Sequence, residues 1–251
     1  MNSMIKYMNE IERLVKEVGE KQADVMEKAA LITADALCTD GFVFTFGTGH
    51  SHILAEEIFY RAGGLVRVCP ILEDALMHHT HAARSSMFER APGLASLLLD
   101  DIDCVKYGGV IFIFSNSGGN TVAVDMAMEA KKRGLIPVCI TNITHSNIIT
   151  SRHPEGLKLK DVCDVVIDNM GCYGDACVTI GNPEAGIAPM TTGATSTVIG
   201  AMVMEAIVCR TIELAAQRGV KLEVFQSGNT HGGDEANEGY IQKYKPLVKA
   251  L

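Results

Sequence analysis

The sequence has no tryptophan and only 6% aromatic residues in its 251 positions, and it has no excess of basic side chains. Its 22 lysines and arginines are outnumbered by 30 acidic residues, which gives a net charge of -8. Proteins that bind the phosphate backbone of nucleic acids usually present a basic face, so this balance argues against a nucleic-acid partner. It leaves room for one buried phosphate site made of neutral hydrogen-bond donors.

The sequence also lacks a long hydrophobic run. The longest apolar stretch in a helical context, residues 198–208, is interrupted by Gly200 and Glu205 and is too short to span a bilayer. The N-terminal segment is charged throughout and has no apolar core of the kind that marks a signal peptide. We therefore expect a cytoplasmic protein without a membrane partner.

The eight cysteines show no pairing pattern. Several lie inside apolar runs, which is typical of free thiols in a reducing cytoplasm rather than of a disulfide framework. The one close pair, Cys172 and Cys177, has the wrong spacing for a zinc knuckle, and no second pair completes one.

What the sequence does contain is an alternation of short apolar runs with amphipathic segments. The apolar runs predict strands at 42–46, 65–69, 110–114, 136–141 and 162–167. Helical spacing predicts one long N-terminal helix at 3–37 and further helices at 53–62, 122–133 and 195–218, whereas 168–194 is expected to be irregular.

Strands that alternate with helices indicate an α/β fold with a parallel sheet covered on both faces. No linker or repeat divides the chain, so we expect a single domain over 1–251, with its core at about 35–215 and a tail at 220–251. Ligands of such sheets bind beyond the carboxyl ends of the strands. The loops at 47–51 and 115–121 are therefore where the chemistry is expected.

The 115–121 loop has the composition of an anion site. Gly118 and Gly119 allow the backbone to approach a ligand closely, and the helix that follows directs its free N–H groups at the same place. The polar side chains of the loop are Ser115, Asn116, Ser117 and Thr121. Ordinary capping of the helix by Ser117 and Asn120 is the alternative, but it would use only part of this set.

The 47–51 loop, which follows the first strand, has a similar composition of glycines and polar side chains. Its residues are Gly47, Thr48, Gly49, His50 and Ser51, and they are expected to contact the sugar end or a second side of the phosphate. The sequence has neither a GxxxxGK[ST] loop nor a GxGxxG fingerprint. A small phosphorylated molecule therefore fits better than a nucleotide.

Together, the GTGHS and SNSGGNT loops resemble the SIS (sugar isomerase) domain, in which two such turns hold a phosphosugar. The resemblance covers about residues 35–215. The segments His78-His-Thr-His81, Ser85-Ser-Met-Phe-Glu-Arg90, Gly174-Asp-Ala176 and Gly232-Gly-Asp-Glu235 resemble a bacterial branch of SIS-domain proteins described as phosphosugar isomerases and related to the phosphoheptose isomerases.

This resemblance implies a flavodoxin-like, three-layer α/β/α sandwich with a five-stranded parallel sheet. It implies phosphate contacts at Ser115, Asn116, Ser117 and Thr121, with Ser51 adding another. It also implies obligate homo-oligomers, here a homodimer or homotetramer, with sites near the subunit boundaries.

The catalytic residues transfer less directly. Phosphoheptose isomerases place a histidine and a glutamate six and ten residues after the loop serine, as metal ligand and base, whereas this sequence has Glu57 and Arg61 there. We therefore predict no metal site of that pattern and no organic cofactor, although a divalent metal stays possible. Candidates for a carboxylate base are Glu57, Glu89 and Glu205.

Several candidate residues have a second possible role. Glu205 lies in an otherwise apolar helix, where an ionisable group is costly without a partner, so it is either functional or a salt-bridged structural residue. One of His78, His79 and His81 could open the sugar ring, and His79 is the catalytic candidate. The three histidines could instead bind a transition metal. The alternative to both is that they lie at the surface or at a subunit interface. His231, next to two glycines, could belong to a lid.

The leading hypothesis is an aldose–ketose sugar-phosphate isomerase that works through an enediol(ate). A non-catalytic phosphosugar sensor is the rival from another class, and a lyase or etherase acting on a phosphorylated amino sugar is a third hypothesis.

Overall fold

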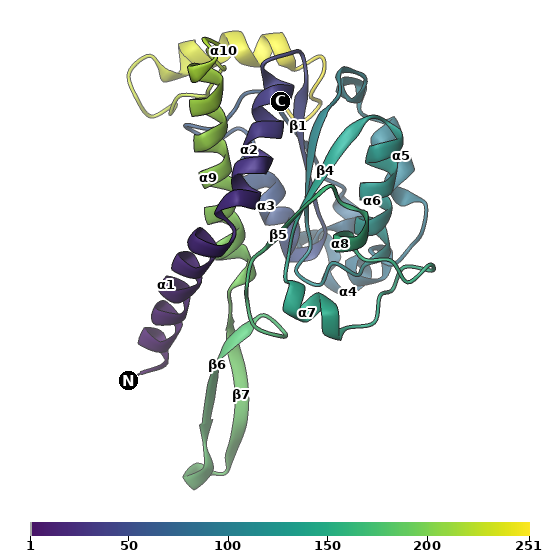
Figure 1. The fold of residues 1–251 in the computed structure, drawn as a ribbon. Helices are drawn as coiled ribbons and strands as arrows, with labels where there is room; N and C mark the ends of the chain where they lie inside the picture. The colour runs from purple at the N-terminus through teal and green to yellow at the C-terminus, as the bar shows by residue number, and fades with distance from the viewer. Residues whose placement is uncertain (1) are drawn as a thin grey trace.

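Five short apolar segments form a parallel sheet at the centre of the molecule (Figure 1). The computed structural model describes residues 2–251. Its strands are β1 (Phe42–Gly47), β2 (Val68–Ile71), β3 (Gly109–Phe114), β4 (Leu135–Thr141) and β5 (Val165–Asp168), in the order β2-β1-β3-β4-β5. All six residues of β1 are buried, because a strand covered on both faces has no polar side. The predicted α/β fold with a five-stranded parallel sheet is confirmed.

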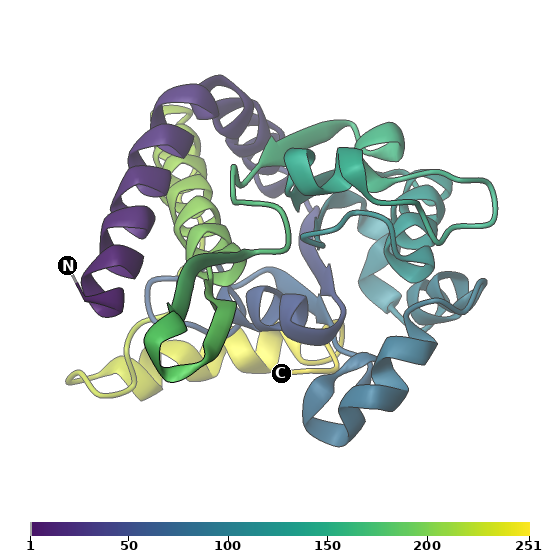
Figure 2. The same ribbon diagram turned by 90° about the horizontal axis from the view of Figure 1, so that it is seen from below.

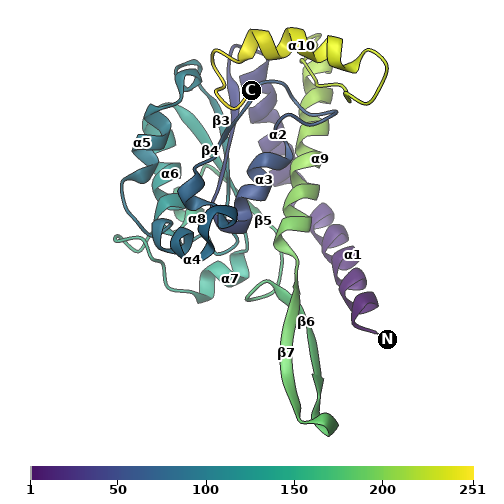
Figure 3. The same ribbon diagram turned by 180° about the vertical axis from the view of Figure 1, so that it is seen from behind.

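Helices cover both faces of this sheet (Figures 1 and 3). On one face, Val110, Phe112 and Phe114 of β3 belong to a hydrophobic core with α1 (Ser3–Lys21), α2 (Ala23–Leu37), α3 (His52–Glu57) and α9 (Ser196–Gln217). On the other face, Ile111 and Ile113 belong to a core with α5 (Leu94–Asp100), α6 (Thr121–Lys132), α8 (Leu159–Val162) and α10 (Gly233–Tyr244). The remaining helices are α4 (His78–Phe88) and α7 (Ile143–Ile148).

The N-terminal segment was predicted as one helix, and the structure divides it into two. The break is at Gln22, which has φ -110° and ψ 4°. Its side-chain carbonyl accepts a hydrogen bond from the backbone N–H of Asp168 at 3.1 Å, so a contact with the end of β5 fixes the change of direction. Neither glycine nor proline marks this position, and helical spacing continues across it, which is why the sequence gives no signal of the break.

Residues 168–194 were predicted to be irregular, and this prediction is wrong for most of the segment. Strands β6 (Ala176–Asn182) and β7 (Ile187–Ala194) form an antiparallel hairpin that projects beyond the carboxyl ends of the parallel strands (Figures 1 and 3). Tyr7 of α1 donates a hydrogen bond from its hydroxyl to the Ala194 carbonyl at 2.7 Å. Most of the hairpin is exposed on both faces, so its sequence lacks the alternation that reveals a half-buried strand.

Three element boundaries also differ from the prediction. The fifth strand begins at Val165 instead of residue 162, and the preceding residues Leu159–Val162 form α8. The second strand begins at Val68 instead of residue 65 and includes Pro70, which is tolerated because β2 is an edge strand with one neighbour. The helix predicted at 53–62 ends at Glu57.

All eight cysteines are free thiols. Across residues 2–251, none of the helices combines the length and apolar character needed to cross a membrane.

Candidate functional site

The two predicted loops leave neighbouring strands at the carboxyl edge of the sheet. The chain passes from β1 to the edge strand β2 on one side, while β3 continues to β4 on the other, so the loops flank the point where the strand order reverses. Figure 2 shows the molecule from this end. A small cavity of about 20 Å³ lies between the loops, and its polar lining consists of His50, Ser51, Ser115, Asn116, Asn169, Ser196 and Thr197.

Three of the four side chains predicted to bind phosphate in the 115–121 loop form hydrogen bonds within the protein. The Ser115 hydroxyl accepts a hydrogen bond from the Gly118 N–H at 3.1 Å, and the Thr121 hydroxyl donates to the Arg152 carbonyl at 2.9 Å. Asn116 accepts from the side-chain amide of Asn169 at 2.8 Å. The half-buried Ser117 side chain forms no hydrogen bond within residues 2–251, which leaves its hydroxyl available to a ligand.

The tightness of this loop depends on Gly118. It has φ +64°, and a β-carbon there would lie 2.8 Å from the Thr141 hydroxyl oxygen. A side chain would therefore be strained and would collide with β4. The close contact of Gly118 in this structure is with Thr141, and the predicted close approach of the backbone to a ligand stays a prediction.

Capping of α6 does not use the two side chains suggested by the alternative hypothesis. Asn120 is the N-cap residue, but its side chain makes no capping hydrogen bond, and neither does that of Ser117. Instead, the Val122 N–H of the first turn donates to the Glu89 carbonyl at 3.1 Å. The polar side chains of the loop are thus not explained by capping.

Glu89 connects the two loops. The buried Thr48 hydroxyl of the first loop donates to Glu89 Oε2 at 3.0 Å, while the Glu89 carbonyl holds the helix that follows the second loop. The carboxylate is only 15% exposed, and the Arg152 guanidinium lies 4.0 Å from it. The structure therefore places a largely buried carboxylate beside both loops.

The histidines divide between two contacts. His78 Nδ1 lies 3.1 Å from His50 Nδ1, and the His79 ring packs at 5.8 Å against that of His52. Burial lowers the pKa of His78, and the neighbouring His50 lowers it further. His81 is exposed at a kink in α4.

Within residues 2–251, no group of three or more histidine, cysteine or acidic side chains is arranged to hold a metal ion.

The other two candidate carboxylates lie around a single arginine. Arg61 is 2.7 Å from Glu57 and 3.2 Å from Glu205. Like Glu89, neither glutamate lines the cavity, but unlike Glu89 neither has a hydrogen bond to one of the two loops. Glu205 thus has an ion-pair partner, as expected if it is a salt-bridged structural residue. Phosphoheptose isomerases hold a metal ion at the positions that correspond to Glu57 and Arg61. In this chain, these two residues form an ion pair, and the positive charge of Arg61 would repel a metal ion. The residues present therefore do not fit a metal site of that pattern.

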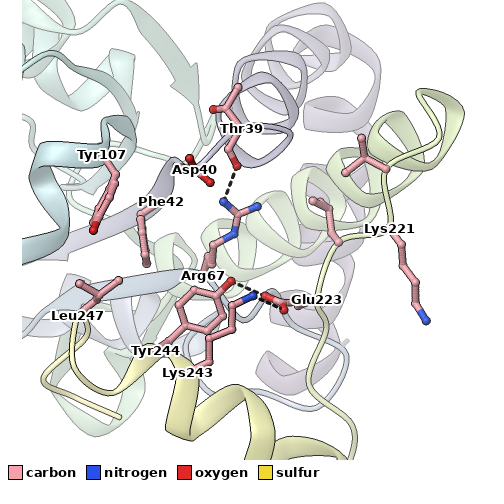
Figure 4. A pocket seen from close by; sticks show the side chains of 12 residues that line it. Thr39, Asp40, Phe42, Arg67, Tyr107, Lys221, Glu223, Lys243, Tyr244 and Leu247 are labelled. Atoms are coloured by element: carbon pink, nitrogen blue, oxygen red, sulfur yellow. Dashed lines mark hydrogen bonds and ion pairs between the residues drawn. The ribbon is translucent and has the colours of Figure 1, made fainter.

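A larger cavity of about 530 Å³ lies at the opposite, amino edge of the sheet (Figure 4). There Arg67 donates hydrogen bonds to the carbonyls of Leu37, Thr39 and Gly41, and Glu223 accepts from Lys243 and Tyr244 (Figure 4). Its polar groups are thus largely bonded to each other.

His231 precedes α10, which covers this amino end of the molecule (Figure 1). A lid role over the loops at the carboxyl edge is therefore wrong for His231.

Sequence reasoning missed Asn169, Ser196, Thr197 and Arg152. Asn169 directly follows β5, so the rule that ligands bind at the carboxyl ends of parallel strands could have found it, whereas Arg152 comes from a loop distant in sequence.

Asp175 caps α9 by accepting hydrogen bonds from the backbone N–H groups of Thr195 and Ser196 at 2.9 and 2.8 Å. This explains the aspartate of the Gly174-Asp-Ala176 segment.

Comparison with known proteins agrees with this geometry. The family model of the SIS domain matches residues 6–142, which begins and ends earlier than the range predicted from the loops. The chain therefore belongs to the SIS domain family. Among its relatives, a UPF0309 protein from Geobacillus thermodenitrificans is 42% identical over 245 residues, covering 98% of this chain and 96% of that protein, which places the chain among the UPF0309 proteins.

Solved structures show the same fold at low identity. A phosphoheptose isomerase from Neisseria gonorrhoeae aligns with a TM-score of 0.52 and 15% identity, over 82% of this chain and 96% of that one. The Vibrio vulnificus NanR protein complexed with ManNAc-6P aligns with a TM-score of 0.52 and 14% identity, over 98% of this chain and 70% of that one.

Proposed function

We propose that the carboxyl-edge site binds a phosphorylated sugar and interconverts its aldose and ketose forms through an enediol(ate). Two solved structures with the same fold are named as a phosphoheptose isomerase and as a protein complexed with ManNAc-6P, which supports the substrate class. The catalytic activity is our inference from the residues at the site.

The observation that carries the proposal is the position of Glu89. Its side chain contacts one loop through Thr48, its backbone holds the helix of the other loop, and its carboxylate is largely buried. A carboxylate withdrawn from water beside a sugar-phosphate site is suited to move a proton on carbon.

Each loop has a distinct part in this reaction. The Ser117 hydroxyl and the backbone N–H groups at the start of α6 bind the phosphate, since a helix N-terminus favours an anion. Glu89 takes the proton from C2 and returns it to C1, while the hydroxyl proton passes from O2 to O1. The reaction requires only proton transfers, so we propose no organic cofactor and no required metal.

The binding cavity must widen to admit a sugar, because about 20 Å³ holds no more than a water molecule. We therefore propose that lining side chains rearrange when the sugar binds, while the His50–His78 and Thr48–Glu89 contacts are kept.

Exchange of carbon-bound hydrogen in deuterated water tests the function. A panel of sugar phosphates is incubated with the protein, and exchange at C2 together with aldose–ketose interconversion is the expected result. Binding without exchange would favour the phosphosugar sensor. Loss of a β-substituent from a phosphorylated amino sugar would favour the lyase or etherase.

For the surroundings of the protein, we propose a homodimer or homotetramer with no nucleic-acid or membrane partner. The net charge of -8 supports the absence of a nucleic-acid partner. The eight free thiols support a reducing compartment such as the cytoplasm.

A further inference from the structure

The contact between His50 and His78 constrains where their protons lie. Their Nδ1 atoms are 3.1 Å apart, and the two rings meet edge to face with centroids 4.7 Å apart. Two Nδ1–H groups would repel each other at this distance, and two bare nitrogens would form no hydrogen bond. A hydrogen bond therefore requires one proton between the two nitrogens, with one ring as donor and the other as acceptor.

The packing of His78 against Gly49 identifies the donor. A β-carbon added at Gly49 would lie 2.8 Å from His78 Nε2 and 2.9 Å from Cε1, so this side of the ring packs on the backbone of the first loop. Within residues 2–251, no group accepts a hydrogen bond from His78 Nε2, whereas Nδ1 faces His50 Nδ1, so a proton on Nε2 would have no acceptor in the protein. The proton of neutral His78 therefore lies on Nδ1, and Gly49, with φ +57°, is the residue that leaves room for the ring.

His50 is consequently fixed in the opposite tautomer. Its Nδ1 accepts from His78, so its own proton is on Nε2, on the edge of the ring turned away from His78. His50 also lines the cavity together with Ser51, Ser115 and Asn116. The Nε2 proton of the exposed His50 has no acceptor within residues 2–251, so it is available to a ligand.

The surroundings of His78 disfavour its protonated form. Burial lowers the pKa of His78, with His50 and His52 acting in the same direction and Glu89 in the opposite one. Arg152 lies 4.0 Å from Glu89 and offsets part of its charge. In its neutral form, His78 can donate from Nδ1 while Nε2 carries no proton.

We propose that His50 donates a hydrogen bond from Nε2 to the sugar oxygen that becomes negative during isomerisation, and that His78 is the positioning residue that sets its tautomer. This inference rests on the proposed function. As Glu89 removes the carbon-bound proton, the electron pair forms a carbon–carbon double bond and the carbonyl π pair moves onto oxygen. His50 stabilises that charge and keeps its proton. Glu89 then returns its proton to the adjacent carbon.

Nitrogen-15 NMR of the ligand-free protein tests the tautomers without any substrate. The expected spectrum has His50 protonated on Nε2 and His78 on Nδ1. In His78→Phe, which keeps the ring but loses the nitrogens, His50 should become a mixture of tautomers. His78→Asn, whose amide can donate from the place of Nδ1, should restore the Nε2–H form. His81→Phe, on the same helix, should leave the His50 signals unchanged.

Three NMR outcomes would overturn the inference. These are an Nδ1–H tautomer of His50 in the unaltered protein, a His50 tautomer that is indifferent to His78→Phe, and stoichiometric micromolar binding of Zn²⁺ by both rings, which would make them metal ligands.

Turnover separates this inference from the proposed function. For a sugar phosphate that the protein isomerises, His78→Phe should lower kcat about 10-fold and His50→Phe about 100-fold, with KM nearly constant. His78→Asn should recover most of the kcat lost in His78→Phe. Wild-type kcat in His78→Phe, with turnover still dependent on Glu89, would overturn the inference alone. Absence of turnover with every sugar phosphate would overturn the proposed function and with it the catalytic role of His50.

Discussion

The two edges of the parallel sheet differ in how their polar groups are used. At the amino edge, a cavity of about 530 Å³ is surrounded by groups that bond to each other, including Arg67 with three backbone carbonyls and Glu223 with Lys243 and Tyr244. At the carboxyl edge, the cavity has a volume of about 20 Å³, and one of the two loops there carries the half-buried Ser117, whose hydroxyl has no partner in residues 2–251. The largely buried carboxylate of Glu89 contacts the other loop through Thr48.

We therefore place the proposed functional site at the carboxyl edge, although its cavity is the smaller of the two. Internal hydrogen bonds at the amino edge stabilise the packing of α10 and of the end of α2, and they leave fewer polar groups free for a ligand. At the carboxyl edge, groups were withdrawn from water without all being satisfied, which is the arrangement that a ligand can complete. Substitutions at the carboxyl edge should change function, and those at the amino edge should change stability.

The largest effect should come from Glu89→Gln. The amide keeps the size of the side chain but cannot take a proton, so we expect kcat to fall about 10²- to 10⁴-fold with phosphosugar affinity nearly intact. Glu57→Gln is the matched control and should lower kcat less, because Arg61 already holds that carboxylate at 2.7 Å. Full turnover in both variants would leave Glu205 or a histidine of 78–81 as the base.

The carboxyl edge is also where apolar surface is left exposed, and assembly should depend on it. Met4 and Met8 of α1 are 64% and 58% exposed, and the neighbouring hairpin exposes Ile187 and Met190. If a second copy covers α1, Met4→Glu with Met8→Glu should weaken assembly by about 3 kcal/mol, the burial energy of two such side chains. Lys16→Glu makes the same change in charge on the exposed side of α1 and should have little effect.

Light scattering would measure this assembly. A mass of 27 kDa for the unaltered protein at micromolar concentration would contradict the prediction, since that is the mass of one chain.

The sequence predicts the central strands well because burial on both faces selects continuous apolar runs. Strands β1, β3 and β4 begin and end within about one residue of their predicted ranges. Prediction fails where a contact distant in sequence decides the local structure. Gln22 breaks the N-terminal helix through a bond to Asp168, and the β6–β7 hairpin has no buried face to give its strands a pattern.

The site follows the same rule. The strand-to-loop transitions locate both loops, because any parallel sheet presents its carboxyl ends together. Which side chains within the loops are free for a ligand depends on tertiary partners such as Arg152 and Asn169, which the sequence does not connect to Thr121 and Asn116. The pairing of Thr48 with Glu89 and of His50 with His78 is likewise visible only in three dimensions.

A smaller effect is expected from Ser117→Ala. Loss of one hydroxyl donor to a charged phosphate should weaken sugar-phosphate binding by about 1–3 kcal/mol without a change in thermal stability. Calorimetric titration measures the affinity. Thr39→Ala removes a hydroxyl at the amino-edge cavity and should leave the affinity unchanged. Equal affinity of the unaltered protein for a sugar and its phosphate would contradict the phosphate site.

At the amino edge, Arg67→Met should show the opposite pattern. The apolar stem of the side chain is kept, but the carbonyls of Leu37, Thr39 and Gly41 lose a charged donor at the end of α2. We expect the free energy of unfolding to fall by about 1.5 kcal/mol, measured with urea, and the sugar-phosphate affinity to stay the same. A change in affinity that exceeds the change in stability would make the amino edge part of the binding site.

The smallest effect should be a pH dependence at the same edge. Burial acts to raise the pKa of Glu223, but hydrogen bonds from Lys243 and Tyr244 outweigh it, and the net shift is downward. A carboxylate with a lowered pKa stabilises the folded state above its unfolded pKa of about 4.3, and this stabilisation is lost as the pH falls through the folded value. Glu223→Gln should remove a contribution of at most about 1 kcal/mol, as for partly exposed ion pairs. Urea unfolding at pH 7 and at pH 3.5 should therefore give a smaller difference between the two pH values in Glu223→Gln than in the unaltered protein, and an equal difference would show that the Glu223 cluster contributes nothing to stability.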